Sequence, residues 1–429
     1  MTSTRDVVVV GGGAVGMCCA YFLWRAGCSV TVVERGDGSD GASHGNAGML
    51  VPSHVVPLAA PGVIAQGLRW LFRSDGPLYI RPRLDRELLR WLWRFRASCT
   101  EAHVQRSVPV LRDLMLASVD LFRDIARLDS VEMDLRENGI LMPYRTAAGK
   151  HHGVEHAETL RSAGLDVDLL DARTLLELEP ALRMEAIGAA YFRQDCHLDP
   201  SSFVRTLAAY LCAHGVEMLS STEVDGFERR GDRIYAIRAG DRRLAARSVV
   251  LATGAFTQRL AAAMGVRVPV QPGKGYSITL PRGGCTLRIP LLLHEVGVTV
   301  TPMGERLRFT GALELAGFDR SIKTGRIAAI LEQVATYLPE TDIGAIHAAV
   351  GGAANGAAVA MWTGFRPCSP DGLPIIGTAP GLANLTLATG HGMLGVALAP
   401  ITGKLVADLV SGEAMPMSLE AAVDPARFA

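Results

Sequence analysis

The 429-residue chain has few cysteines, and they form no metal-binding or redox pattern. It contains no C-x-x-C pair and no His/Cys cluster at metal-ligand spacing. Because zinc sites need such clusters and secreted scaffolds use paired cysteines, we expect no metal site and a reducing, cytoplasmic location. The cysteines are Cys18, Cys19, Cys28, Cys99, Cys196, Cys212, Cys285 and Cys368.

Net charge and long apolar runs are also lacking. The 43 basic residues balance 43 acidic ones, so nucleic acid is not an expected partner. Residues 345–361 are rich in Ala and Gly, but His347 and Asn355 interrupt them, and the stretch is too weakly hydrophobic for a transmembrane helix. The first strand pattern begins about six residues into the chain, so we expect no signal peptide.

The chain does contain a Gly-rich turn between a buried strand and a helix. Four valines at 7–10 lead into Gly11, Gly13 and Gly16, which form a G-x-G-x-x-G pattern, and a second β-branched strand ends at Glu34. The glycines permit a tight turn, backbone contact with a pyrophosphate and close helix packing, while a terminal acid can bind a ribose. The pattern predicts a dinucleotide site within one βαβ unit.

Strand patterns typical of a nucleotide-binding sheet occur at the start, middle and end of the chain. Its length exceeds that of a single core, so two domains are expected. The fold class is α/β, with a Rossmann-type dinucleotide-binding domain and an inserted α+β substrate domain on a mainly antiparallel sheet. The first domain is predicted to comprise 1–65, 196–265 and 362–429, and the second 66–195 and 266–361.

Four blocks resemble the flavin-dependent amine oxidoreductases, which include D-amino-acid oxidase, glycine oxidase and sarcosine oxidase. The strongest likeness is to bacterial D-amino-acid dehydrogenases, which share elements like 57–62, 274–277 and 389–392. The four blocks are Gly11 to Gly16 with Glu34, Ala42 to Met49, Thr253-Gly254, and Trp362 to Gly395.

The resemblance implies a Rossmann-type FAD-binding domain with non-covalent FAD, because Cys368 does not clearly match the attachment cysteine of sarcosine oxidase. Residues 47–50 would line the flavin ring, Val224 would meet the adenine, and Gly392 would open a helix through Leu409 whose N-terminus stabilises negative charge on the reduced ring. The predicted cofactor residues are Gly11, Gly13, Ala14, Val15, Gly16, Glu34, Arg35, Ser43, Asn46, Ala47, Gly48, Met49, Leu50, Val224, Thr253, Gly254, Gly392, Met393, Leu394 and Gly395.

Arg366 matches the arginine that binds the substrate carboxylate in glycine oxidase and D-amino-acid oxidase, and a guanidinium fork suits a carboxylate. Tyr276 is expected either to add a hydroxyl to that carboxylate or to be a half-buried strand tyrosine. His391 is expected either to contact the substrate or the flavin ring, where it could take the amine proton, or to support residues that do. Weaker candidates for the pocket are His54, His294 and Glu295.

The implied activity is oxidation of a D-amino acid at the Cα–N bond by hydride transfer to flavin N5. The imino acid formed from a primary amine would then hydrolyse to a keto acid and ammonia. Alternatives are a D-proline or D-hydroxyproline dehydrogenase giving a cyclic imine, a sarcosine or glycine oxidase, and a non-catalytic flavin subunit of an amine dehydrogenase complex. A carboxylate anchor such as Arg366 argues against the last.

The electron acceptor is left open between a quinone or other carrier and oxygen. Residues 69–96 hold eight arginines and three of the five tryptophans. A basic, Trp-bearing helix is compatible with a peripheral contact with the inner face of the cytoplasmic membrane, near quinone. The competing interpretation is core packing with solvated arginines.

Overall fold

The structure is a computed structural model that describes residues 5–38, 41–71, 78–182, 186–338 and 359–428. Residues 345–358 of the Ala/Gly-rich stretch, and 72–77 of the basic segment, lie outside these ranges. Within the described ranges, no helix is long and apolar enough to cross a membrane. The eight cysteines are all unpaired thiols.

The first sheet is built around β1, whose valines are buried on both faces. Flanking strands β2 and β12 run parallel to β1, as expected for a β-branched strand buried on both sides. The strand order is β10 (Val224–Arg230), β11 (Arg233–Ala239), β12 (Arg242–Leu251), β1 (Arg5–Val10), β2 (Val30–Val33) and β9 (Glu217–Leu219), with β19 (Leu385–Thr389) on β12 and β18 (Ile375–Thr378) on β19.

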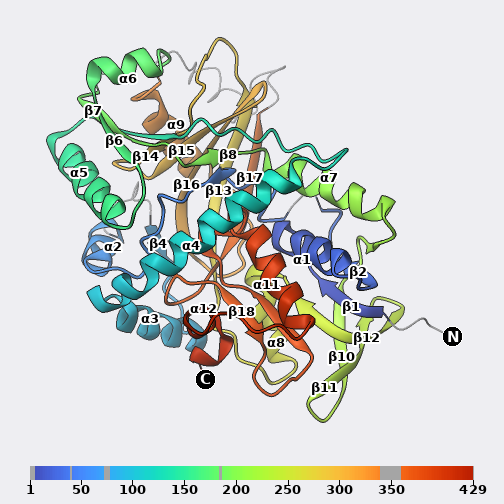
Figure 1. Ribbon diagram of the computed structural model, residues 1–429. Helices are drawn as coiled ribbons and strands as arrows, with labels where there is room; N and C mark the ends of the chain where they lie inside the picture. Colours follow the sequence, from blue (N-terminus) through green and yellow to red (C-terminus); the bar gives the residue numbers. More distant parts are fainter. Residues whose placement is uncertain (1–4, 39–40, 72–77, 183–185, 339–358, 429) are drawn as a thin grey trace.

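The second sheet is mainly antiparallel and draws its strands from two stretches of the chain (Figure 1). Its order is β17 (Ala360–Cys368), β13 (Gln271–Pro281), β16 (Arg306–Leu315), β15 (Val298–Met303), β14 (Leu291–Leu293), β5 (Ile140–Tyr144), β7 (Gly188–Phe192) and β6 (Val167–Asp171), with β4 (Leu78–Ile80) on β16. Strands β3 (Met49–Leu50) and β8 (Cys196–His197) form a separate pair.

Helices cover both sheets. They are α1 (Ala14–Arg25), α2 (Val63–Leu71), α3 (Arg86–Ser98), α4 (Glu101–Ile125), α5 (Ala147–Ser162), α6 (Ala172–Leu178), α7 (Pro200–Ala213), α8 (Thr257–Ala262), α9 (Thr324–Ala335), α11 (Ala399–Val410) and α12 (Met417–Val423). Short 3-10 turns are η1 (Gly254–Phe256), η2 (Gly392–Leu394) and η3 (Pro425–Phe428).

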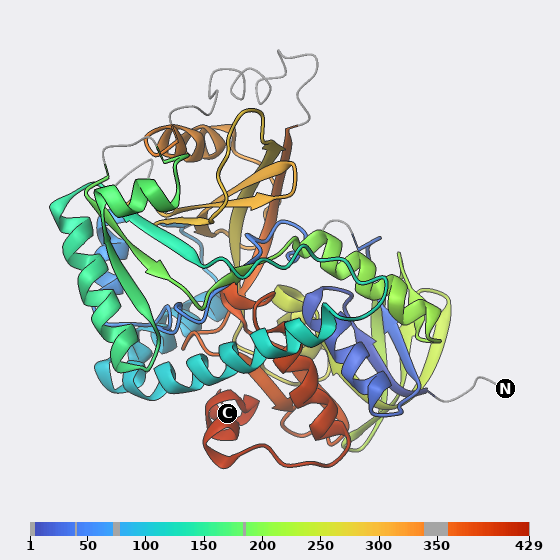
Figure 2. The ribbon, with the colours of Figure 1, turned by 45° about the horizontal axis from the view of Figure 1, so that its top comes forward.

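Helix α4 ties the two parts together (Figure 2). Its buried residues, including Leu111 and Phe122, share one apolar core with Met17 of α1. The Ser118 hydroxyl also donates a hydrogen bond to the Ala397 carbonyl at 2.6 Å. Although α4 falls in the segment assigned to the substrate domain, it therefore packs against the nucleotide-binding side.

The predicted boundary at 362 is wrong. Residues 362–368 were assigned to the nucleotide-binding domain, but β17 pairs with β13 along its whole length in the second sheet. Residues 362–395 were treated as one block, yet the backbone hydrogen bonds of its first part, β17, go to β13. The chain returns to the first sheet only at β18.

Candidate active site

The turn from β1 into α1 leaves no room for side chains. Gly11 has φ +107°, and a Cβ there would lie 2.5 Å from the Ala252 carbonyl oxygen. A Cβ on Gly16 would come within 1.8 Å of the Gly11 carbonyl oxygen. The N-cap residue of α1, Gly13, has no side chain to cap the helix, and among the described residues only the Gly12 and Ala14 N–H groups of the turn are bound by side chains, those of Glu34 and Ser43. The other N–H groups at the helix start suit a phosphate.

Glu34 lies at the end of β2, beside this turn. Its carboxylate accepts hydrogen bonds from the backbone N–H groups of Gly12, at 2.6 Å, and Gly36, at 2.8 Å. The neighbouring Arg35 guanidinium stacks over the Phe256 ring, 3.8 Å from its centroid. Both residues border the same cavity, so the acid stands at its ribose end.

A cavity of about 300 Å³ runs from this turn toward the second sheet. Among the predicted cofactor residues, those that line it are Gly11, Gly13, Ala14, Val15, Glu34, Arg35, Ser43, Asn46, Val224, Thr253, Gly254, Gly392 and Gly395. A larger pocket of about 730 Å³ adjoins it, and Ala42, Asn46, Gly364, Phe365 and Arg366 line both. Ala47, Met49, Met393 and Leu394 line only the larger pocket.

Three predicted cofactor residues line neither cavity. Gly16 and Gly48 instead allow close backbone packing. A Cβ on Gly48 would lie 2.1 Å from the Leu198 carbonyl oxygen, and one on Gly16 would also meet a backbone carbonyl oxygen. Leu50 is fully buried in the first core, whereas Met49 faces the pocket. Successive side chains of a strand point to opposite faces, so the prediction that Leu50 lines the flavin ring is wrong.

The loop between the two cavities is held from both ends. Ser43 Oγ accepts a hydrogen bond from the Ala14 backbone N–H at 2.9 Å, and Asn46 Oδ1 accepts one from the Gly48 N–H at 2.8 Å. Arg308 of β16, buried, donates to the carbonyls of His44 and Asn46, both at 2.8 Å. Sequence reasoning missed Arg308; the signal was a charge between the apolar residues Leu307 and Phe309 of a strand pattern.

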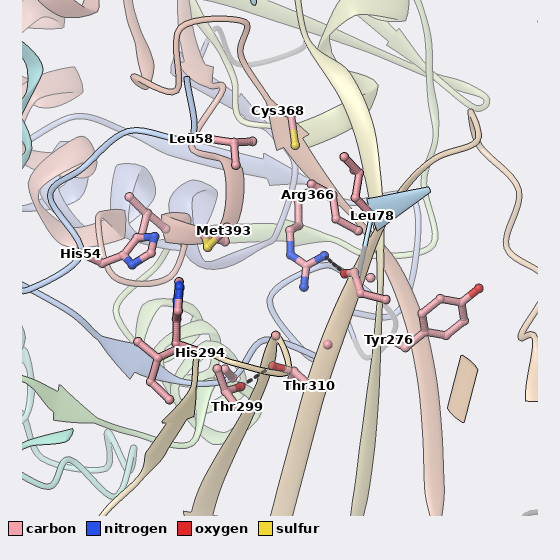
Figure 3. Close-up of a pocket in the computed structure, with 18 of the residues that line it drawn as sticks. His54, Leu58, Leu78, Tyr276, His294, Thr299, Thr310, Arg366, Cys368 and Met393 are labelled. Atoms are coloured by element: carbon pink, nitrogen blue, oxygen red, sulfur yellow. Dashed lines mark hydrogen bonds between the residues drawn. The ribbon is translucent and has the colours of Figure 1, made fainter. Parts of the chain in front are cut away.

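Arg366 projects from β17 into the larger pocket (Figure 3). It passes over Gly275 of β13, where a Cβ would lie 2.3 Å from its Nη1. Its Nη1 donates to the Ala312 carbonyl at 2.8 Å, and burial lowers its pKa. Among the described residues, no carboxylate forms an ion pair with it, so the remaining donors are available to an anion.

Tyr276 borders that pocket, but its hydroxyl points away from it. Its ring lies on the opposite side of β13 from Arg366 (Figure 3), is 1% exposed and belongs to the second core. The hydroxyl hydrogen-bonds to Glu314 Oε1 at 3.2 Å. Because Gly275 presents the face toward Arg366, the next residue must face away, and the prediction of a substrate-binding hydroxyl is wrong.

His391 is also turned away from the larger pocket. Its side chain is buried, and Nε2 pairs with Thr402 Oγ1 of α11 at 2.9 Å. Burial lowers its pKa to about 3, so it is neutral and a poor proton acceptor near neutral pH. The supporting role, rather than contact with substrate, fits this geometry.

Burial of neutral His391 predicts a pH-dependent stability. Its folded-state pKa of about 3 lies below the unfolded value of 6.5, so its contribution is complete above pH 6.5 and falls as the pH drops toward 3. Between pH 6.5 and pH 5 the loss is at most about 2 kcal/mol. His391→Gln keeps a hydrogen-bonding group but does not titrate in this range. In urea unfolding, its free energy of unfolding should therefore fall less between pH 6.5 and pH 5 than that of the wild type. An equal fall in both proteins would contradict a buried, neutral His391.

The predicted helix from Gly392 to Leu409 begins later than expected. Residues 392–394 form the 3-10 turn η2, and α11 starts only at Ala399. Gly392 has φ +55°, outside the helical region. An α-helix N-terminus directly at Gly392 is therefore wrong, although both glycines of the segment border the nucleotide cavity.

The weaker candidates His54, His294 and Glu295 all line the larger pocket. The Glu295 carboxylate, however, is already bound: it accepts hydrogen bonds from the Arg145 backbone N–H at 2.8 Å and the Tyr337 hydroxyl at 2.9 Å. The Cys368 thiol also borders the pocket, and burial raises its pKa to about 11. A protonated thiol is a weak nucleophile, so this chemistry agrees with a flavin that is not covalently bound.

A Cβ-free turn at a helix N-terminus, an acid at its ribose end and an adjoining pocket with a buried arginine define a dinucleotide-dependent oxidoreductase. The two adjoining cavities offer one site for a dinucleotide and another for a substrate. A family model described as FAD dependent oxidoreductase matches residues 6–409, and the chain belongs to that family. The predicted cofactor and fold class are thereby confirmed.

Similar proteins agree over nearly the whole chain. It is 36% identical over 415 residues to a D-amino acid dehydrogenase of Methylobacterium radiotolerans, covering 95% of this chain and 96% of that protein. A D-amino acid dehydrogenase of Granulibacter bethesdensis is 33% identical over 413 residues, with the same coverage. The crystal structure of glycine oxidase from Geobacillus kaustophilus matches with a TM-score of 0.76 and 25% identity, covering 100% and 98% of the two chains.

Proposed function

We propose that this enzyme oxidises D-amino acids at the Cα–N bond. The observation that carries the proposal is Arg366, a buried guanidinium in the wall of the pocket that adjoins the nucleotide cavity, with no carboxylate partner among the described residues. A buried cation without a counter-ion suits an anionic ligand, and an amino acid supplies a carboxylate. The names of the curated relatives support the D configuration.

The chain's own residues position and shield the substrate. Arg366 would fix the carboxylate and so orient the Cα–H bond, while the apolar pocket wall excludes water. Residues from Gly11 to Gly16, with Glu34, would hold the pyrophosphate and ribose of FAD, which when bound accepts the hydride from Cα. Since His391 is neutral and occupied by Thr402, we assign proton removal from the amine to water.

Anaerobic bleaching of the bound flavin tests the proposal. Purified holoenzyme is mixed with D- and L-enantiomers of alanine and leucine, with D-proline and hydroxyprolines, and with sarcosine and glycine. Bleaching by the D-enantiomers alone is expected. Bleaching confined to sarcosine or glycine would overturn the proposal in favour of that oxidase, bleaching confined to cyclic substrates would identify a D-proline type enzyme, and none at all would indicate a non-catalytic subunit.

We further propose that the acceptor is a quinone, reached where α2 and α3 meet a membrane surface. Trp93 is 71% exposed and Leu89 56% exposed on one face of α3, next to several arginines. An exposed apolar and cationic face suits anionic lipid. Trp91, in contrast, is buried and donates a hydrogen bond to the Cys368 carbonyl at 2.9 Å, so part of the segment packs in the core.

Vesicle binding tests this surface. A Leu89→Ser, Trp93→Ser double variant is expected to lose most of its sedimentation with phosphatidylglycerol vesicles while keeping its flavin bleaching. Tyr235→Ser, which alters an exposed residue of the nucleotide-binding sheet, is the matched control and should bind like the wild type. Undiminished binding by the double variant, or equal binding to neutral phosphatidylcholine, would contradict a basic lipid-binding face.

A further inference from the structure

The larger pocket has a second polar region besides Arg366. His54, from the loop after β3, and His294, from the turn after β14, lie side by side in its wall, away from the guanidinium (Figure 3). His156 of α5 borders the same region. Much of the surrounding wall is apolar, with Ile140 and Leu292 nearby in the lining. Three imidazoles therefore meet in a mainly apolar cavity.

The histidine rings are packed but not hydrogen-bonded by their neighbours. The His294 ring stacks on His152, with centroids 4.1 Å apart and planes 16° apart, and His156 meets the edge of Phe192. Within the described ranges, no hydrogen bond joins a ring nitrogen of His54 or His294 to another residue. His54 is partly buried and His294 is exposed, and both border the pocket. Their ring nitrogens are therefore open to a ligand that enters it.

Other polar groups of this wall already have partners. Thr299 and Thr310 share a hydrogen bond at 2.5 Å (Figure 3). Asp195 accepts hydrogen bonds from the backbone N–H and hydroxyl of Ser53. No group of three or more described His, Cys, Asp or Glu side chains has a geometry that could hold a metal ion. In this part of the wall, the histidine rings are therefore hydrogen-bonding groups that these neighbours leave open.

We propose that His54 and His294 form a side-chain subsite, which selects D-amino acids that carry a neutral hydroxyl or amide group over aliphatic ones of the same shape. This inference rests on the proposed function: the substrate carboxylate binds Arg366, and the substrate side chain extends toward the imidazoles. Each neutral imidazole offers one N–H donor and one acceptor nitrogen, which matches a hydroxyl or amide.

Charge argues against an anionic or cationic side chain. Burial and the neighbouring rings lower the pKa of His294 to about 4 and that of His156 to about 3, and burial lowers the pKa of His54. All three are thus neutral near pH 7. A carboxylate in the substrate side chain would share the pocket with Asp195, whose pKa burial raises to about 7, and with Glu295. A cationic side chain would meet uncharged rings and a Glu295 carboxylate that already accepts hydrogen bonds from Arg145 and Tyr337.

Isosteric substrate pairs test the subsite. D-asparagine and D-leucine have nearly the same shape, as do D-threonine and D-valine, and they differ in hydrogen bonding alone. For the wild type, kcat/KM is expected to favour the polar member by about tenfold or more, because an aliphatic side chain leaves the imidazoles unpaired. His294→Leu should reduce this ratio by about fivefold or more, by lowering kcat/KM for the polar member only.

His294→Gln keeps hydrogen bonding and should retain most of the preference, and His54→Gln provides the same comparison at the second ring. His151→Leu, an exposed histidine of α5 paired with Glu155, is the matched control and should leave the ratio unchanged. A wild type without polar preference, or an unchanged ratio in His294→Leu, would overturn the subsite. If the wild-type enzyme oxidised no D-amino acid at all, D-alanine included, that result would instead overturn the proposed function.

Discussion

Replacing Arg366 by alanine is expected to lower kcat/KM for D-amino acids by about 10²- to 10³-fold while FAD stays bound. Removing one partner of a buried, hydrogen-bonded charge pair costs about 3–4 kcal/mol, because the substrate carboxylate then enters an apolar wall without a cation. The measurement is steady-state reduction of an artificial acceptor, with the flavin absorbance spectrum recorded on the same sample. The loss should be largest in KM, because the ground state already contains this ion pair.

Two further variants test whether the loss is specific to the Arg366 guanidinium. Arg366→Lys keeps the charge but lacks the planar fork, and so should recover only part of the activity. Arg243→Ala removes an exposed arginine that pairs with Glu228 at 3.0 Å on the nucleotide-binding sheet, far along the chain from the pocket, and should behave as the wild type. An Arg366→Ala enzyme with near-normal kcat/KM would show that the carboxylate binds elsewhere.

The second large effect is expected at Gly16. A methyl group there overlaps the Gly11 carbonyl oxygen at 1.8 Å, so β1 and α1 must separate. We expect Gly16→Ala to be purified with little or no FAD and to be less stable by about 3 kcal/mol or more. The flavin absorbance per protein and the midpoint of thermal unfolding measure both effects.

Gly13→Ala is the matched control. Its methyl group would lie 3.2 Å from Ser43 Oγ, a contact that a small side-chain movement can relieve. It should therefore bind FAD more weakly than the wild type but far better than Gly16→Ala. If Gly16→Ala retained a full complement of FAD and normal stability, the close approach of α1 to β1 would not be needed for the site.

The nucleotide-binding unit was predictable because its signals are local. The signals lie within one short stretch of chain: the valines of β1, the glycines of the turn, and Glu34. Each interacts with, or sets the conformation of, backbone close to it in the sequence. Thirteen predicted cofactor residues accordingly border the nucleotide cavity. Arg366 was found through the resemblance, and the structure puts it in the wall that the two cavities share.

The errors have a common physical origin. Tyr276 and Leu50 each lie on a strand, which gives alternate residues to opposite faces, so one step of register decides which side chain meets the pocket. Of the alternatives for His391, the supporting role agrees with the structure, because its partner Thr402 lies on the helix that follows. Arg308 was overlooked because its acceptors, in the 44–46 loop, are more than 260 residues away in sequence.

By itself the sequence determined an α/β flavoprotein with a dinucleotide site on its first βαβ unit, because glycine conformations and strand patterns are properties of neighbouring residues. Tertiary structure alone decided which residues face the substrate. Pairing of β17 with β13 brings Arg366 over Gly275 and sends Tyr276 into the second core. The same folding gathers His54, His156 and His294, from three separate segments, into one wall, an arrangement that long-range packing produces and local pattern does not encode.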